Sequence, residues 1–183
     1  KYLKEIFYLI FPEFNNLDRL DRLKKICNSS QVNKNMLLAV LLIDEKDNHE
    51  YFAHKYDIAK NIKENLNLLA RNLKLSRECK DFFGKDLEKN IYLNNKNHLI
   101  DLNIINFVNN NKRKEKDFSD TLKKILQSKN NIFPIDGKYL MQKGMKEGLK
   151  LGRVLNMIEE EWIANGFEIS KNRVVEIIKL NSN

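Results

Sequence analysis

The sequence predicts an all-α protein, on three observations. Only two prolines and six glycines interrupt its 183 residues. Apolar residues recur at steps of three and four, which is the period of one helical face, and no stretch shows the sustained alternation typical of a half-buried strand. We expect an irregular helical body over residues 1–131, followed by a small helical tail over residues 132–183.

Four helices are expected in the first part of the body. Pro12 should end the first, because proline cannot donate the backbone hydrogen bond of a helix interior. The second covers 17–26, where the charged residues between the leucines, including Arg19 and Arg22, should face water. The third covers 34–43. The fourth and longest covers 51–73, with a core-facing stripe at helical spacing formed by Ile58, Ile62, Leu66, Leu69 and Leu73.

A helix corner and two further helices are expected in the rest of the body. Ser76 suits the N-cap of a new helix over 77–83, and Gly84 suits its left-handed C-terminal cap. A turn at 94–97 precedes a helix that begins at about His98, and the polar, basic stretch 109–114 is a loop before a helix over 117–127.

The charge balance favours an anionic partner. Lysine and arginine total 33 against 25 acidic residues, which gives a net charge of +8 and a pI near 9.3. RNA, DNA and a membrane surface all fit this charge. The longest apolar run, 36–43, is far shorter than the roughly 20 residues that span a bilayer, and no signal-peptide pattern is present. A soluble, cytoplasmic protein is expected.

The sequence contains no arrangement of residues suited to catalysis or to metal binding. Cys27 and Cys79 are isolated and are expected to be core thiols. His49 and His54 are five residues apart, so on a helix their rings would lie about 140° apart and could not easily share a metal ion. We expect surface histidines, no metal site and no catalytic residue. The acidic runs, such as Asp44 to Asp47, fit solvated helix ends.

Glycines cluster in the tail, where five of the six fall between residues 137 and 166. Asp136 and Gly137 can open a short helix that Gly144 closes with a positive φ. Gly148 would free the backbone before the last long helix. Gly152, one turn later, would let another backbone or a phosphate come close.

The last long helix brings an apolar stripe and a basic surface into this segment. Its stripe comprises Leu151, Leu155, Ile158 and Trp162, and Gly166 suits its C-terminal cap. The glycines are surrounded by basic residues, which we name the basic corner: Lys138, Lys143, Lys146, Lys150 and Arg153. Backbone amides at a helix start, together with lysines, form a plausible phosphate site. The alternative is a helix corner whose lysines serve only solubility; the same alternative holds for the basic stretch 112–124.

Several motifs resemble those of a known family. FPIDGKYLM (133–141), GM (144–145), Gly148, GRVL (152–155) and EEWI (160–163) resemble the C-terminal tail of bacterial tRNA nucleotidyltransferases, the CCA-adding enzyme and poly(A) polymerase family. Upstream, FPE (11–13) is similar to the family's element just after its neck region, and LKLS (73–76) to its helix corner. The chain departs from the family at Tyr139, where an Asp is common, and at 146–149, where a proline-rich turn is common.

The resemblance implies that a catalytic head and a neck precede Lys1. In the family the head holds Mg²⁺ through carboxylates, and the neck selects CTP or ATP. None of those motifs is found in this chain, so the resemblance implies no cofactor and no catalytic site here. Body and tail would then grip the acceptor and TΨC arms of tRNA and position the 3′ end for addition of CCA or A.

Two other functions are compatible with the sequence. One is a helical protein-interaction or dimerisation module, with no RNA ligand, in which the stripe of Leu151, Leu155, Ile158 and Trp162 faces a partner chain such as a second copy. The other is an independent metal-dependent hydrolase.

Overall fold

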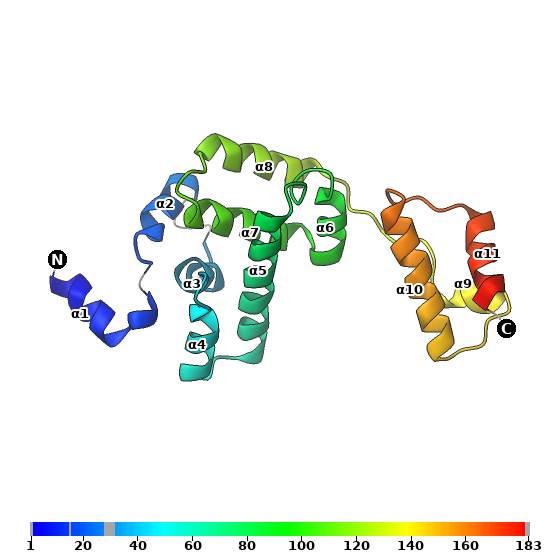
Figure 1. Cartoon of the computed structure of the whole chain (residues 1–183), viewed down its shortest axis with the longest axis horizontal. Helices are drawn as coiled ribbons and strands as arrows, with labels where there is room; N and C mark the ends of the chain where they lie inside the picture. The colour runs from blue at the N-terminus through cyan, green and yellow to red at the C-terminus, as the bar shows by residue number, and fades with distance from the viewer. Residues whose placement is uncertain (1, 15, 28–31, 182–183) are drawn as a thin grey trace. The chain divides into compact units, whose positions relative to one another are not determined.

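The computed structural model describes residues 2–14, 16–27 and 32–181. Over these ranges the backbone forms eleven α-helices, one 3₁₀ helix and no strand, so the all-α prediction is confirmed (Figure 1). The chain divides into two compact units, Lys1–Ser128 and Lys129–Asn183, which are called the body and the tail below. The sequence places this boundary slightly later, between residues 131 and 132.

The helices of the body follow the expected order except over 51–73 and 77–83, and the helix over 87–94 was not predicted. Pro12 acts as predicted, because the first helix ends at Ile10 and Pro12 opens a 3₁₀ turn. In chain order the elements are α1 (Tyr2–Ile10), η1 (Pro12–Phe14), α2 (Arg19–Ile26), α3 (Lys34–Leu42), α4 (Asn48–Lys55), α5 (Lys60–Glu78), α6 (Leu87–Asn94), α7 (Lys96–Asn109) and α8 (Glu115–Gln127).

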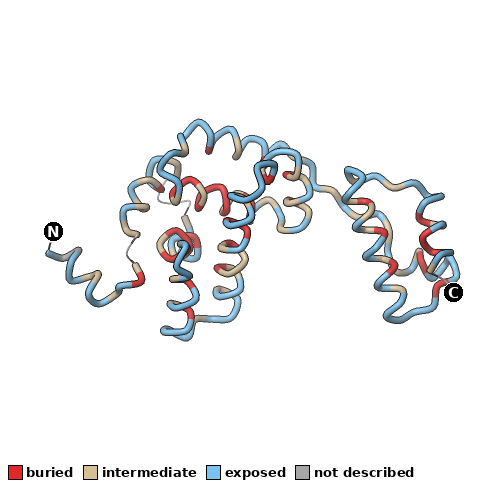
Figure 2. The backbone as a smooth tube through the Cα atoms, in the orientation of Figure 1, coloured by how far each residue is buried: buried red, intermediate tan, exposed pale blue. Residues whose placement is uncertain are grey.

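Helix α7 forms the centre of the body. It packs against α2, α3, α5, α6 and α8, and most of its length is buried (Figure 2). Leu99, Leu102 and Ile105 have no exposed surface. A helix that is apolar on most sides must be covered on most sides, so the other helices of the body are arranged around this one.

The prediction of one long helix over 51–73 is wrong, because the chain breaks this stretch into α4 and α5. Asp57 adopts a left-handed conformation with a φ of 45°, and α5 begins only at Lys60. The predicted stripe from Ile62 to Leu73 does belong to α5, whereas α4 buries His49 and Ala53. The turn at Asp57 changes the direction of the chain, so that both helices can bury an apolar face. Aspartate tolerates the left-handed backbone better than most residues.

The helix corner predicted at Ser76 is also wrong. Helix α5 continues through Ser76 to Glu78, and the Ser76 hydroxyl donates to the carbonyl of Leu73 at 2.8 Å. A serine inside a helix can bond back to the preceding turn instead of capping a new helix. Residues 80–86 form turns in which Gly84 has no positive φ. Cys79 is exposed there, contrary to the expected core thiol, while Cys27 is half-buried against the core.

Two arginines of α2, expected to face water, instead bind the ends of other helices. Arg19 donates to the carbonyls of Val40 and Ile43 at 3.0 and 2.7 Å, at the end of α3. Arg22 donates to the carbonyl of Phe107 at 2.8 Å, near the end of α7, and its guanidinium lies 4.4 Å from the Phe107 ring centre. The last carbonyls of a helix lack partners and carry partial negative charge, so these contacts join α2 to α3 and α7.

A buried ion pair holds η1 to α4. The Glu13 carboxylate has almost no exposed surface and accepts a 2.7 Å hydrogen bond from Lys55 Nζ. Burial is the largest single influence and would raise the pKa of Glu13, but the hydrogen bonds from Lys55, from the Glu13 backbone and from Tyr56, together with the charge of Lys55, outweigh it, so the pKa is lowered from its ordinary value. Phe14 and Phe52 pack edge to face beside this pair, with ring centres 5.4 Å apart.

Two of the three histidines are buried, which corrects the expectation of surface histidines. His49 and His98 are only 3% and 7% exposed, whereas His54 is exposed. The Asn72 amide nitrogen donates to Asn94 Oδ1 and lies 2.9 Å from His98 Nε2. Since an amide nitrogen can only donate, Nε2 of His98 must be the unprotonated acceptor.

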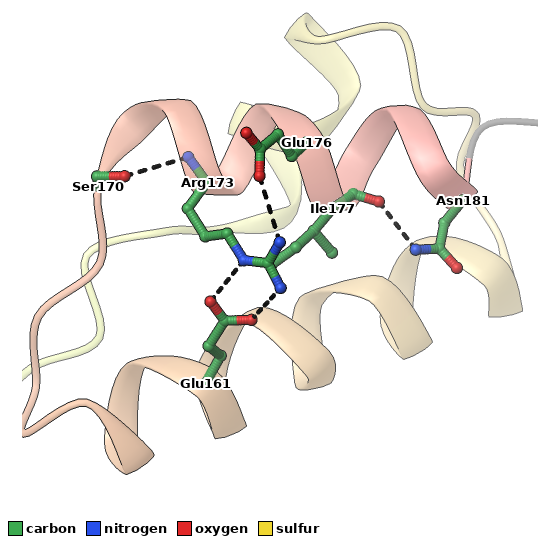
Figure 3. A network of polar contacts seen from close by, with 6 residues as sticks. All are labelled: Glu161, Ser170, Arg173, Glu176, Ile177 and Asn181. Carbon is green, nitrogen blue, oxygen red and sulfur yellow. Dashed lines mark hydrogen bonds and ion pairs between the residues drawn. The ribbon is translucent and has the colours of Figure 1, made fainter.

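The tail has a core of its own, formed by α9 (Gly137–Gln142), α10 (Leu149–Ala164) and α11 (Lys171–Asn181). Trp162 lies between the rings of Phe133 and Phe167, at 5.3 and 4.9 Å. Arg173 of α11 binds both carboxylate oxygens of Glu161 in α10, at 2.7 and 3.0 Å (Figure 3). The buried residues of this core are Leu140, Met145, Val154, Ile158, Val174, Ile177 and Ile178.

Replacing Arg22 by lysine should destabilise the body by about 1–3 kcal/mol, because lysine cannot reach several carbonyls at once or stack on Phe107. Urea unfolding followed by far-ultraviolet circular dichroism measures this destabilisation. The control is Arg71→Lys on the exposed face of α5, which should change stability by less than about 0.5 kcal/mol. Equal stability of the two variants would contradict the role assigned to Arg22.

The stability of the body should fall in mild acid through His98. Burial, and then the charge of Arg71, lowers the pKa of His98 below its ordinary value of 6.5. The unfolded chain therefore binds more protons in this range, so this contribution is complete above pH 6.5 and is lost as the pH falls through the lower folded pKa.

A His98→Gln variant should lose this pH dependence, because glutamine can still accept a hydrogen bond from Asn72 and does not titrate. Unfolding free energies measured from about pH 7.5 to about pH 5, which brackets the ordinary histidine pKa of about 6.5, test this. The pKa of His49 is also lowered by burial, and its contribution is common to both proteins, so the difference between them isolates His98. Parallel curves would show that His98 is not responsible.

Candidate nucleic-acid interface

The start of α9 is built as the sequence predicts. The Asp136 side chain accepts a hydrogen bond from the backbone N–H of Tyr139 at 2.8 Å, and so caps the helix. Gly137 follows and faces α10, since a Cβ atom added there would lie 3.3 Å from Leu151 Cδ2. The first turns of α9 and α10 are therefore in contact.

The end of α9 confirms the prediction for Gly144, which has a φ of 95°. The N–H of Met145 bonds to the carbonyl of Leu140 at 3.2 Å, and that of Lys143 to the carbonyl of Tyr139 at 3.2 Å. Leu140 and Met145 are both buried. A left-handed glycine followed by an apolar residue that packs back on the helix is a Schellman-type ending, and it fixes the direction of the following turn.

The start of α10 depends on Gly148, which has a φ of 145° and a ψ of −173° and occupies the N-cap position. The N–H of Leu151 bonds to the carbonyl of Gly148 at 3.1 Å. Glycine offers no side chain to cap the first amides, and the start of a helix carries the positive end of its dipole. This end of α10 can therefore accept an anion.

Gly152 differs from its expected role. No described atom other than those of its own helix and chain neighbours lies within 4 Å of the position that a Cβ would take, so no other backbone approaches it. The residue is exposed on the second turn of α10, next to Arg153. The structure thus rules out close helix packing at Gly152 and leaves the surface there open to a ligand.

All five residues of the basic corner are exposed. Lys138 lies in the first turn of α9, Lys143 and Lys146 in the connecting turn, and Lys150 and Arg153 in the first turns of α10. Nζ of Lys143 lies 5.6 Å from the centre of the Tyr139 ring. Among the described residues, no carboxylate lies within ion-pair distance of four of these cations, namely Lys138, Lys143, Lys146 and Arg153.

The apolar stripe of α10 is used inside the tail. Ile158 and Trp162 are 0% and 4% exposed, and Leu151 and Leu155 are half-buried against the same core. A partner chain would have to open the tail to reach Ile158 and Trp162.

Helix α11, which covers part of this stripe, is missing from the sequence prediction. The helical spacing of Val174, Ile177 and Ile178 could have revealed it. So could Ser170, whose hydroxyl accepts a hydrogen bond from the N–H of Arg173 as an N-cap does.

The described residues contain no group of three or more His, Cys, Asp or Glu side chains placed to hold a metal ion. None of the described helices is both long enough and apolar enough to cross a bilayer. Comparison of the chain with protein-family models, curated proteins and solved structures found no match.

Substituting the tail glycines by alanine should separate the strained positions from the open one. Gly144→Ala should destabilise the tail by about 1–2 kcal/mol and Gly148→Ala by about 1–3 kcal/mol, because both backbones have positive φ. Gly152→Ala should instead stabilise it by about 0.5–1 kcal/mol, since its helical site has open space.

Urea unfolding followed by the fluorescence of Trp162 measures these effects in the tail alone, since Trp162 is the one tryptophan of the sequence. If Gly152→Ala destabilised the tail as much as Gly148→Ala does, Gly152 would have to be packed against another part of the protein.

Proposed function

We propose that this chain is the tRNA-binding part of a cytoplasmic tRNA nucleotidyltransferase, and that it positions the acceptor end of tRNA for addition of CCA or A nucleotides. The observation that carries the proposal is the basic corner, in which exposed cations surround the open start of α10. The motifs of the tail, in the order that the family has them, and the net charge of +8 support it.

The basic corner suits the backbone of an RNA duplex. A-form RNA offers phosphates and 2′-hydroxyl groups to proteins more readily than base edges. Lysines and a helix start bind phosphate without reading sequence. The glycine turns at Gly144 and Gly148 would hold Lys143 and Lys146 on a short, constrained connection, which lowers the entropic cost of ordering the cations when RNA binds.

In this proposal the chain binds RNA and does not catalyse. Nucleotide transfer, together with Mg²⁺ and CTP or ATP, is assigned to a head that is not among these 183 residues. The contribution of body and tail is to hold the substrate, since fixing the reacting groups in position is a large part of catalysis.

Binding of a minihelix made of the acceptor and TΨC arms tests the proposal. Affinity should fall linearly with the logarithm of salt concentration. The double variant Lys146→Gln/Arg153→Gln should bind more weakly and reduce the salt slope by about 2, because each cation that neutralises a phosphate contributes about 1 to that slope. Fluorescence anisotropy over a salt series measures both quantities.

The matched control is Lys171→Gln/Lys179→Gln, which removes two exposed charges from α11 of the same tail. It should keep the wild-type slope. Wild-type affinity that is indifferent to salt would refute RNA binding of this kind.

A second candidate is a helical dimerisation module, which the exposed apolar side chains of α1 favour. Tyr2 and Leu9 are 82% and 83% exposed, and Ile10 is also exposed. Light scattering should then give the mass of a dimer that Leu9→Ser converts to a monomer, with no effect on minihelix binding. A monomer at all concentrations would remove this candidate.

A further inference from the structure

The outer face of α5 carries a row of cations. Lys60, Lys63, Arg71 and Lys74 are exposed and follow one another, with Asn67, at the spacing of a single helical face. The opposite face is buried in the core of the body through Leu66, Leu69 and Leu73. Core packing of one face therefore fixes the direction in which the basic face points.

Three hollows follow this face, and we name them together the furrow because neighbouring hollows share lining residues. Its first part, about 400 Å³, is lined by α5 alone, from Glu64 to Arg71. The second, about 530 Å³, shares Asn67 and Arg71 with the first and reaches Arg77. The third, about 610 Å³, shares Arg77 with the second and ends at Lys112, in the loop between α7 and α8. The furrow thus follows α5 for about four turns and then crosses to that loop.

Cations and amides line the furrow. The cations are Arg71, Lys74, Arg77 and Lys112. The amides are Asn67, Asn106, Asn109, Asn110 and Asn111. No Phe, Tyr or Trp side chain is among the described residues that line it, and the imidazole of His49, which does line it, is only 3% exposed. Cations bind phosphates and amides bind hydroxyl groups, whereas binding of unpaired bases usually needs aromatic rings to stack on. The lining therefore fits a ribose–phosphate backbone.

The carboxylates of the furrow leave part of its basic wall free. Asp44 is occupied, since its carboxylate accepts hydrogen bonds from the N–H of Lys46 and from the backbone and side chain of Asn48. Glu45 pairs with Arg77 at 3.2 Å. No described carboxylate lies within ion-pair distance of Arg71 or Lys74.

The other acidic residues of the furrow are Glu64, which pairs with Lys60 at 3.8 Å, Asp47 and Glu50 on the wall formed by α4, and Glu78 at the end of α5. The α4 pair would repel phosphates from that wall and direct a strand toward Arg71 and Lys74.

We infer that the furrow is a second RNA-contact surface of this chain, which binds the backbone of one strand of an RNA duplex without preference for its bases. This inference rests on the proposed function and adds to the basic corner a surface in the body. The cations expected to contact phosphates are Arg71, Lys74 and Lys112.

Minihelix binding by the full 183-residue chain tests the furrow with the variant Arg71→Gln/Lys74→Gln. It should weaken binding and reduce the salt slope by about 2, and a duplex of changed base sequence should bind equally well. The matched control is Lys85→Gln/Lys89→Gln, which removes two exposed charges outside the furrow and should bind as wild type. Because the charge of Arg71 acts on His98, Lys74→Gln/Lys112→Gln provides a second furrow variant that leaves Arg71 in place.

The outcomes separate this inference from the proposed function. If both furrow variants bind as wild type while Lys146→Gln/Arg153→Gln does not, the furrow inference is wrong and the proposed function stands. If the furrow variants weaken binding no more than the control at Lys85 and Lys89 does, only net charge matters, which also overturns the furrow. Wild-type binding that ignores salt would refute both.

Discussion

The body depends on the burial of one helix, α7. Its apolar side chains meet neighbours on most sides, so the other helices must cover it. Covering a helix completely also buries its carbonyl end, where the last groups have no partners within the helix. Arg22 supplies missing donors by reaching the carbonyls of Phe107 and of Asn110, which directly follows the helix. The surrounding elements are positioned so that they cover the apolar sides of α7 and supply donors to its carbonyl end.

Three sets of buried polar groups join elements of the body. Glu13 has Lys55, Asn72 has Asn94 and His98, and the Asn103 amide donates to the carbonyl of Phe118. The set of Glu13 joins elements that are distant in sequence, whereas that of Asn103 joins the consecutive helices α7 and α8. Each set would be costly with one member removed, because a buried polar group without a partner loses its water and gains nothing. These pairs therefore define which helices meet.

The two proposed RNA-contact surfaces share a physical design. In both, a glycine turn or a buried helical face holds exposed cations in fixed directions, and bound phosphates would replace water around them. The lining of the furrow has no described Phe, Tyr or Trp ring for stacking, and its one described imidazole, His49, is buried. The basic corner offers one tyrosine, over whose ring Lys143 lies. Such surfaces recognise shape and charge, which is what the proposed binding of RNA without base preference requires.

Local sequence patterns were enough to predict the helical class, most helix boundaries and the turns of the tail. Asp136, Gly144 and Gly148 take their predicted roles because a cap or a positive φ depends on one residue and its near neighbours. Only the tertiary structure shows which polar residues are buried. Arg22 bonds to a carbonyl 85 residues away, and no local pattern contains that partner. The same reason explains the buried His49, the reversal at Asp57 and the furrow, whose walls come from helices and loops that only the tertiary fold brings together.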